Sequence, residues 1–337
     1  MTPLEIALLV YHGGYRFSEL EPHLELKAFL EHSDPKKAQK FRERCNEEEF
    51  ERQKFLIEKY DVRLISFWDD SYPESLRKSK FPPVVLFVRG DDSLLRKSCV
   101  GVVGTRKPTG YGISVTRRFV GLLCERFVIV SGMALGIDSV AHREALERGG
   151  KTVAVLGTGV DVIYPKSNKD LFIRILESGC VVSEYPMGIR PQKYHFPARN
   201  RIIAGLSKAI IVTEAPVRSG ALITAKFAVE NGRDVFAVPG DIDRSTSEGT
   251  NYLVKSGAYP LTDEEDLRLY FGIASKKDLS LDPAQKMVFE SLKVSPKSVD
   301  ELIEELKWDV SEVLRVISEL ELMGLVEFTG GTYRTLG

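Results

Sequence analysis

The sequence predicts an α/β protein whose centre is a doubly wound, mainly parallel sheet. Apolar runs rich in Val and Ile alternate with helical patterns in the middle of the chain, at 100–104, 127–131, 152–156, 180–183, 209–213 and 234–238. Continuous apolar runs indicate strands covered on both faces, and their alternation with helices is typical of parallel sheets. Three of the runs end in a glycine-rich turn. These turns should therefore lie at the carboxyl ends of strands, where such sheets bind ligands.

Residues 1–60 are predicted to form a small N-terminal helical module. A short apolar segment precedes the pair Gly13–Gly14, and a strongly charged stretch follows from Lys36 to Lys59. Solvated helix faces account for these charges without any further role. The pattern then changes to short apolar runs at 63–68 and 84–88, separated by proline-containing turns. These runs predict two strands that precede the central sheet.

The domain of the central sheet is expected to span residues 61–271, followed by a polar linker at 272–283. Residues 284–337 show three helical segments and a short hairpin, which is the pattern of a winged helix. Asp282 is expected to cap the first helix. Ser298, with Glu301 three residues later, predicts a capping box at the second helix.

Charge is distributed unevenly along the chain. The whole sequence carries a net charge of −1. Residues 100–218 contain 17 Lys and Arg against 9 Asp and Glu, whereas residues 279–337 contain 6 against 11. A basic centre favours a polyanionic ligand. The third helix of the winged-helix domain, at 309–323, is acidic and poorly suited to a phosphate-lined groove, so a protein partner is favoured over DNA for that domain.

Composition indicates a soluble cytoplasmic protein that needs no cofactor. The chain has 337 residues, of which 43% are hydrophobic, and no segment approaches the ~20 apolar residues of a membrane span. The cysteines, Cys45, Cys99, Cys124 and Cys180, lie far apart without paired spacing. They are expected to be buried thiols in a reducing compartment rather than zinc ligands or disulfides. The five histidines show no metal-ligand spacing either.

Three glycine turns are candidates for binding anions. They are Gly104-Thr105-Arg106, Ser131-Gly132 and Gly157-Thr158-Gly159. Glycine lets backbone N–H groups approach an anion, and the helix that follows adds its positive end. In the simplest interpretation the glycines only permit tight turns. Several such turns at one edge of a sheet, close to a basic loop, suit a ligand with several phosphates.

Two common nucleotide motifs are incomplete here. The dinucleotide fingerprint needs a third glycine three residues after Gly159, where the sequence has Val162. Gly149-Gly150-Lys151-Thr152 resembles the end of a phosphate-binding P-loop, but Ala145 replaces the first glycine and a strand follows instead of a helix. A NAD site and a P-loop are therefore both disfavoured.

The basic loop contributes Lys193, Phe196, Arg199, Asn200 and Arg201. Cations that follow a phosphate backbone, with an aromatic ring between them, suit a single nucleic-acid strand because the ring can stack on a base. Arg106 adds a further guanidinium just beyond the first glycine turn.

Structural roles for the same residues stay open. Phe196 suits a hydrophobic core, and Arg199 and Arg201 have Glu184 and Glu214 as candidate ion-pair partners. No Ser/His/Asp spacing, metal cluster or activated cysteine stands out. A catalytic base would have to be one of the carboxylates Asp138, Glu184 and Glu214, but capping and ion pairing explain each of them, and we do not expect an enzyme.

Many ordered motifs between about residues 60 and 260 resemble the DNA-processing protein A family, also called Smf. The motifs are Tyr72-Pro73-Glu74-Ser75-Leu76, Val103–Arg106, Tyr111-Gly112, Ser131–Asp138, Gly150–Gly159, Tyr164-Pro165, Ser183–Pro186, Phe196–Ile203, Glu214-Ala215, Ser219–Ala225 and Val235–Gly240.

This resemblance implies an extended Rossmann-like fold that binds single-stranded DNA and loads RecA recombinase onto it during natural transformation. It also implies a homodimer, joined through the late part of the Rossmann-like domain. The family's DNA-contacting positions correspond to Arg106, Lys193, Phe196 and Arg199. The resemblance further assigns a phosphate-binding role to the turns at Gly104, Ser131 and Gly132.

Two other classes of protein stay as alternatives. A nucleotide phosphoribohydrolase would share a related sheet, but its paired glycines and glutamate are missing from the stretch Pro216–Leu222. A transcription regulator would sense a nucleotide in the sheet domain and read DNA with its winged helix. The acidic third helix disfavours that second alternative.

Overall fold

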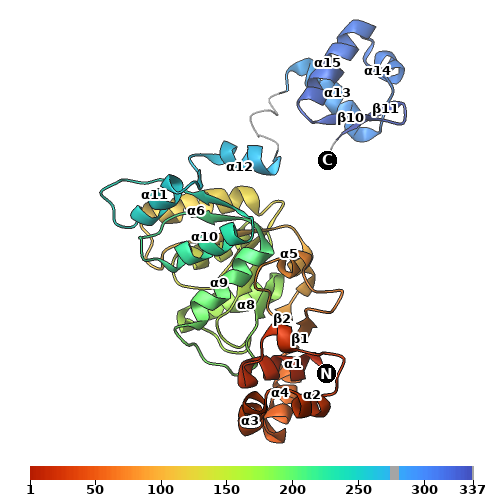
Figure 1. Ribbon diagram of the computed structural model, residues 1–337. Coiled ribbons are helices and arrows are strands. Elements are labelled where there is room, and N and C mark those ends of the chain that lie inside the picture. The colour runs from red at the N-terminus through yellow and green to blue at the C-terminus, as the bar shows by residue number, and fades with distance from the viewer. Residues whose placement is uncertain (274–280, 336–337) are drawn as a thin grey trace. The chain divides into compact units, whose positions relative to one another are not determined.

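The computed structural model describes residues 1–273 and 281–335, which form two compact units (Figure 1). The first unit comprises residues 1–262, and the second begins at residue 263. Most of the predicted linker, 272–283, lies outside the described residues. The prediction of an α/β protein with a helical N-terminal module and a C-terminal winged helix is confirmed.

The first unit is built on a nine-stranded sheet with the order β1-β2-β6-β5-β4-β3-β7-β8-β9. Strands β3 to β9 pair in parallel, whereas β1 and β2 form an antiparallel edge. All eight apolar runs expected from the sequence are strands, and the two-residue β9 is an addition. The strands are β1 Arg63–Ser66, β2 Val85–Gly90, β3 Cys99–Val103, β4 Val128–Ser131, β5 Thr152–Val155, β6 Cys180–Ser183, β7 Ser207–Val212, β8 Asp234–Ala237 and β9 Tyr259–Pro260.

The strand order contains one switch point, between β3 and β7. The chain fills the positions on one side of β3 with β4, β5 and β6, and helix α9 then returns it to the other side to form β7. The loops that leave β3 and β7 therefore diverge at the carboxyl edge of the sheet. A crevice at this place is the usual ligand site of doubly wound folds.

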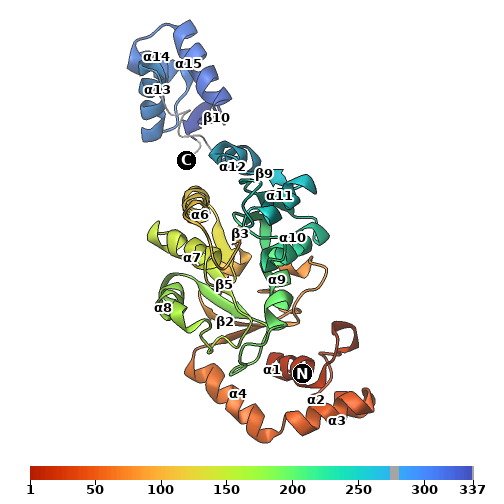
Figure 2. The same cartoon turned by 90° about the vertical axis from the view of Figure 1, so that its left-hand side faces the viewer.

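Helices cover both faces of the sheet, as Figure 2 shows. Alternating strand residues face opposite sides, so Leu86 and Val88 belong to the buried cluster that includes α9 and α10, whereas Val85 and Phe87 belong to the cluster that includes α1 and α8. The helices of the sheet domain are α5 Glu74–Arg77, α6 Gly110–Leu123, α7 Ile137–Glu147, α8 Lys169–Ser178, α9 His195–Leu206, α10 Gly220–Glu230 and α11 Glu248–Lys255, with short 3₁₀ turns η3 Asp92–Arg96 and η4 Lys166–Asn168.

The N-terminal module packs directly on the sheet and shares its core. Leu4, Ile6 and Leu8 belong to the same buried cluster as Phe87 and Phe172. The module is helical throughout, as expected, and consists of α1 Pro3–Leu8, the π-helical turn η1 Leu9–Gly13, the 3₁₀ turn η2 Phe17–Glu19, α2 Leu26–His32, α3 Pro35–Arg44 and α4 Glu47–Lys59.

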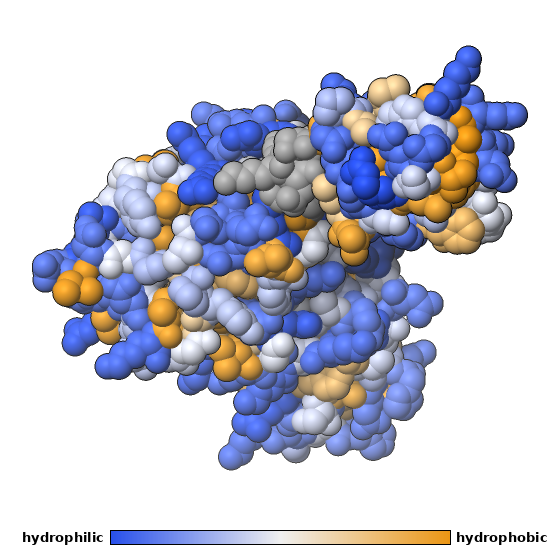
Figure 3. All heavy atoms as spheres, turned by 90° about the horizontal axis from the view of Figure 1, so that it is seen from above, coloured by the Kyte–Doolittle hydropathy of each residue, from blue (hydrophilic) through white to orange (hydrophobic). Residues whose placement is uncertain are grey.

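The second unit contains α12 Glu264–Phe271 and the winged helix. The latter consists of α13 Pro283–Val294, α14 Val299–Leu306, α15 Val310–Leu322, β10 Val326–Thr329 and β11 Thr332–Thr335. The predicted caps at Asp282 and Ser298 are confirmed. Arg315 of α15 is paired with Glu319 on the same helix at 2.7 Å. Figure 3 shows apolar side chains at the surface of this unit, where Val310 and Leu322 are exposed.

The four cysteines are free and buried, as predicted. Among the residues that the structure describes, no cluster of His, Cys, Asp or Glu has the arrangement of a metal site. No described helix combines the length and the apolar composition that crossing a membrane would require.

A buried histidine of the sheet domain should make stability depend on pH. His142 of α7 is fully buried, its Nδ1 lies 2.6 Å from the Thr152 hydroxyl, and burial lowers its pKa to about 3. The unfolded chain binds this proton below about pH 6.5, but the folded chain does not. The stability that neutral His142 contributes is therefore complete above pH 6.5 and is lost progressively as the pH falls towards 3.

We expect His142→Gln to remove about 2 kcal/mol of the stability difference between neutral pH and pH 5. Urea unfolding at the two pH values measures this difference. Burial also lowers the pKa values of His12 and His195, so the free energy of unfolding of the variant should still depend partly on pH. His23→Gln is the matched control because His23 is exposed. Equal pH dependence of wild type and His142→Gln would show that His142 does not carry the effect.

Candidate functional site

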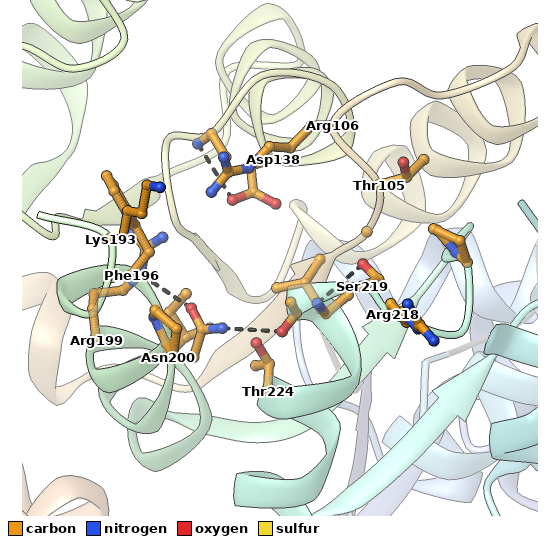
Figure 4. A pocket seen from close by; sticks show the side chains of 18 of the residues that line it. Thr105, Arg106, Asp138, Lys193, Phe196, Arg199, Asn200, Arg218, Ser219 and Thr224 are labelled. Atoms are coloured by element: carbon orange, nitrogen blue, oxygen red, sulfur yellow. Dashed lines mark hydrogen bonds between the residues drawn. The ribbon is translucent and has the colours of Figure 1, made fainter. Parts of the chain in front are cut away.

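A pocket of about 580 Å³ lies at the switch point of the sheet. Its walls come from the loop after β3, the loop after β7 and the first turns of α9 and α10 (Figure 4). Ser219, Gly220 and Ala221 line it where α10 begins. A helix start carries partial positive charge and backbone N–H groups, so this wall suits an anion.

Three exposed cationic side chains line the pocket, in addition to the buried Arg199. Arg106 follows β3, Lys193 precedes α9 and Arg218 precedes α10, and all three are exposed. In the described parts of the chain, no carboxylate forms an ion pair with any of them. Asp138 is the one acidic residue among the lining residues, and it is buried. The pocket is therefore open to phosphate groups.

Aromatic rings lie beside these cations. The Arg106 guanidinium lies 5.5 Å from the centre of the Phe196 ring, and the Tyr164 ring lies 5.4 Å from the same ring. Phe196 is partly exposed, and Gly157 provides space for it, since a Cβ there would lie 3.1 Å from the ring. A ring held in place beside a cation is a platform on which a base can stack.

Arg199 lies beneath the pocket and is only 3% exposed. Its Nη1 donates hydrogen bonds to the carbonyl of Gly132, at 2.6 Å, and to that of Val155. Its Nε donates to Asn200 Oδ1 at 3.2 Å, and Asn200 Nδ2 donates to the Gly220 carbonyl at 3.1 Å. These bonds connect the ends of β4 and β5 with the start of α10, across the switch point.

Asp138 compensates the buried charge of Arg199. Burial lowers the pKa of Arg199 to about 10, while the negative charge of Asp138 opposes that shift. Burial likewise raises the pKa of Asp138, and Arg199 counteracts it. Asp138 also accepts a hydrogen bond from Ala134 N at 3.3 Å. Charge compensation and the hydrogen bond from Ala134, rather than the expected helix capping, therefore account for Asp138.

The structure places the predicted site residues in two groups. Gly104, Thr105, Arg106, Lys193, Phe196, Arg199 and Asn200 line the pocket. Ser131 is fully buried and donates to the Val102 carbonyl at 2.6 Å, and Gly132 lines only a small adjoining cavity. Arg201 forms two hydrogen bonds with Glu184, at 2.7 and 2.6 Å, and is not among the lining residues. This is one of the ion pairs that the sequence left open.

Several lining residues were missing from the sequence-based site, and those with a polar or aromatic group to offer a ligand include Tyr164, Arg218, Ser219 and Gly220. The signal for three of them was the stretch Arg218-Ser219-Gly220, a small polar turn between a strand and a helix like the turns after the other strands. Tyr164 stands in the motif Tyr164-Pro165, which contributes to the family resemblance, but that resemblance assigned it no part in binding. Of the carboxylates considered as bases, Glu214 is buried and accepts a hydrogen bond from Thr109 N at 2.8 Å, outside the pocket lining.

The fold and the pocket define a Rossmann-like protein that presents cations and an aromatic ring at its switch point, with a winged helix attached. Residues 63–271 match the family described as DNA recombination-mediator protein A, and residues 274–332 match the DprA winged helix domain. The chain therefore belongs to the DNA recombination-mediator protein A family, whose members are also called DprA or Smf.

Three relatives illustrate the similarity. DNA processing protein DprA of Streptococcus pneumoniae is 48% identical over 206 residues, which are 61% of this chain and 73% of that protein. The X-ray structure of DprA from S. pneumoniae matches with a TM-score of 0.67 and 40% identity, over 80% of this chain and 93% of that one. A Helicobacter pylori DprA structure, described as showing a single-stranded DNA binding mode, matches with a TM-score of 0.57 and 30% identity. The match covers 63% of this chain and 96% of that one.

Proposed function

We propose that the switch-point pocket binds single-stranded DNA without strong sequence preference. The observation that carries this proposal is the convergence of Arg106, Lys193 and Arg218 on one pocket together with the ring of Phe196. Cations neutralise phosphates of any sequence, and a ring stacks on any base. The single-stranded DNA binding named for the H. pylori relative supports the same conclusion.

Each group of pocket residues has a distinct role in this proposal. The loop at Gly104 and the start of α10 approach the phosphates, and the three exposed cations neutralise them. Arg199 and Asn200 hold the walls in place from below. DNA contacts by Thr105, Ser131, Gly132 and Arg201 stay predictions, because hydrogen bonds or an ion pair within the protein already occupy the polar groups described for these residues.

The wider role that we propose is to load RecA recombinase onto the bound strand in natural transformation and recombination, as a binding protein rather than an enzyme. The family description, recombination mediator, supports a role of this kind. We further propose a homodimer joined through the late part of the Rossmann-like domain, where Val229, Ile242 and Tyr252 are exposed. The four free thiols of the chain suit the cytoplasmic location that we also propose.

Fluorescence anisotropy with a labelled poly-dT oligonucleotide tests the proposed function. We expect tight binding that weakens as salt rises and that a duplex of equal length competes for poorly. Other single-stranded sequences should bind with similar affinity. Binding of mononucleotides without binding of oligonucleotides would contradict the proposal and favour the phosphoribohydrolase alternative.

A chain without residues 279–337 provides the matched control for the location of the site. The first unit has its own core, so this deletion should leave the affinity for poly-dT within about twofold of wild type. Loss of binding on deletion would place the site in the winged helix instead.

A further inference from the structure

A second pocket, of about 350 Å³, lies where the N-terminal module meets the sheet domain. We call it the aromatic pocket. It is lined by Tyr11 and His12 of η1, Arg44 of α3, Tyr185 after β6, and Tyr194 and His195 at the start of α9. None of these residues takes part in the function proposed above.

Four of the lining residues form a connected series of rings. Tyr185 stacks on His195 with ring centres 4.0 Å apart, and Tyr11 meets the edge of Tyr185 at 6.2 Å. Tyr194 meets His195 edge to face at 4.6 Å and is 69% exposed. An exposed ring next to an ordered stack is suited to hold a flat aromatic ligand.

The polar groups of the aromatic pocket are compatible with a nucleobase. Nε2 of His12 and Nε2 of His195 are buried and have no hydrogen-bond partner among the described residues. The Nδ1 of His195 lies 3.0 Å from the Gly157 carbonyl and therefore carries the proton, so its Nε2 is an acceptor. A buried acceptor without a partner is costly, and a base whose ring N–H or amino group reached this Nε2 after a movement of the covering side chains would satisfy it.

Charge at this pocket favours the phosphate that accompanies a base. Glu184 also lines the pocket, but its carboxylate is paired with Arg201 at 2.6 Å. Arg44 is exposed, and within the described ranges no carboxylate pairs with it. The lining thus presents one available cation.

The two pockets flank the same helical turn. Lys193 and Phe196 line the switch-point pocket, whereas Tyr194 and His195, which lie between them in sequence, line the aromatic pocket. A strand that leaves Phe196 over the start of α9 would therefore meet Tyr194 next. This continuity, rather than the rings alone, points to a particular occupant.

We propose that the aromatic pocket holds a nucleobase of the same DNA strand whose neighbouring nucleotides occupy the switch-point pocket. The inference rests on the proposed function, because it extends the path of that strand. It gives the N-terminal module a direct part in DNA binding through Tyr11 and Arg44. The path is then longer than the central pocket alone provides.

Tyr194→Ala tests the inference, because this side chain is exposed and its removal should leave the fold intact. Anisotropy is measured in the full-length protein with dT oligonucleotides of increasing length. Wild type and variant should bind the shortest ligands equally. The affinity of wild type should rise with oligonucleotide length more than the affinity of the variant does. With the longest oligonucleotides the variant should bind about fivefold or more weakly than wild type. Phe55→Ala, which removes an exposed ring of α4, should behave as wild type.

Photocrosslinking provides the second measurement. An oligonucleotide with 5-iododeoxyuridine should crosslink to Tyr11, Tyr185 or Tyr194, as well as near Phe196. Equal affinities of wild type and Tyr194→Ala at every length, with crosslinks only near Phe196, would overturn the inference. If the binding of short oligonucleotides still depended on Arg106, the proposed function would stand without the inference. If no oligonucleotide binds wild type, the proposed function and the inference both fail.

Discussion

Replacing Arg106 by alanine should weaken the binding of single-stranded DNA by about tenfold or more, to a similar extent for every sequence. Arg106 is exposed in the switch-point pocket, its guanidinium lies 5.5 Å from the centre of the Phe196 ring, and no described carboxylate neutralises it. The variant therefore loses a phosphate contact and a cation beside the stacked base. The slope of log affinity against log salt concentration should also fall by about 0.7.

Anisotropy titrations at several salt concentrations measure both effects. Lys78→Ala is the control, because it removes the same charge from an exposed side chain that pairs with Glu74 outside the pocket lining. We expect this control to bind almost as wild type does. If both variants lost the same affinity, the effect would come from net charge and not from the pocket. Unchanged binding by Arg106→Ala would contradict the location that we propose.

Replacing Arg199 by alanine should lower the free energy of unfolding by about 3 kcal/mol or more. The guanidinium is buried, donates to the carbonyls of Gly132 and Val155, and faces the negative charge of Asp138. Its removal leaves those carbonyls without a partner and Asp138 without its compensating charge. Urea unfolding measures the loss.

A comparison of Arg199→Ala with Arg199→Lys separates stability from direct DNA contact. A single ammonium group cannot reproduce the fork that reaches two carbonyls and Asn200, so we expect Arg199→Lys to recover only part of the stability. Because lysine keeps the positive charge, the salt dependence of binding is measured on folded Arg199→Ala, which should keep the wild-type slope if Arg199 only positions the pocket. A slope lowered by about 0.7 would instead show that Arg199 contacts a phosphate.

The sequence was sufficient to predict the sheet, because apolar runs and glycine turns are local signals. It could not separate Arg199 from Arg201 or from Arg106. All three were expected to contact the same ligand, Arg106 from a glycine turn and the other two from the basic loop, but Arg199 is buried beneath the pocket, Arg201 pairs with Glu184 and Arg106 is exposed. These differences depend on which face of α9 meets the sheet and on residues distant in sequence.

Other features left no pattern that a sequence could show. The strand β9 has two residues, too few for an apolar run. Tyr164 reaches the pocket because its loop packs beside Phe196, a contact between segments 32 positions apart in the printed sequence. The aromatic pocket likewise needs Tyr11 and Tyr185, which only the packing of the N-terminal module brings together.

The hydrogen bonds that run from Val155 through Arg199 and Asn200 to Gly220 have a mechanical consequence. These bonds connect the two halves of the sheet domain across the switch point. The crevice therefore cannot open by a hinge motion of the two halves without breaking them. Any adjustment of shape on binding must then come from the nucleic acid. A lone strand turns freely about its backbone bonds, whereas a double helix stays straight over about 150 base pairs. Rigidity of the protein would thus select for flexibility in its ligand.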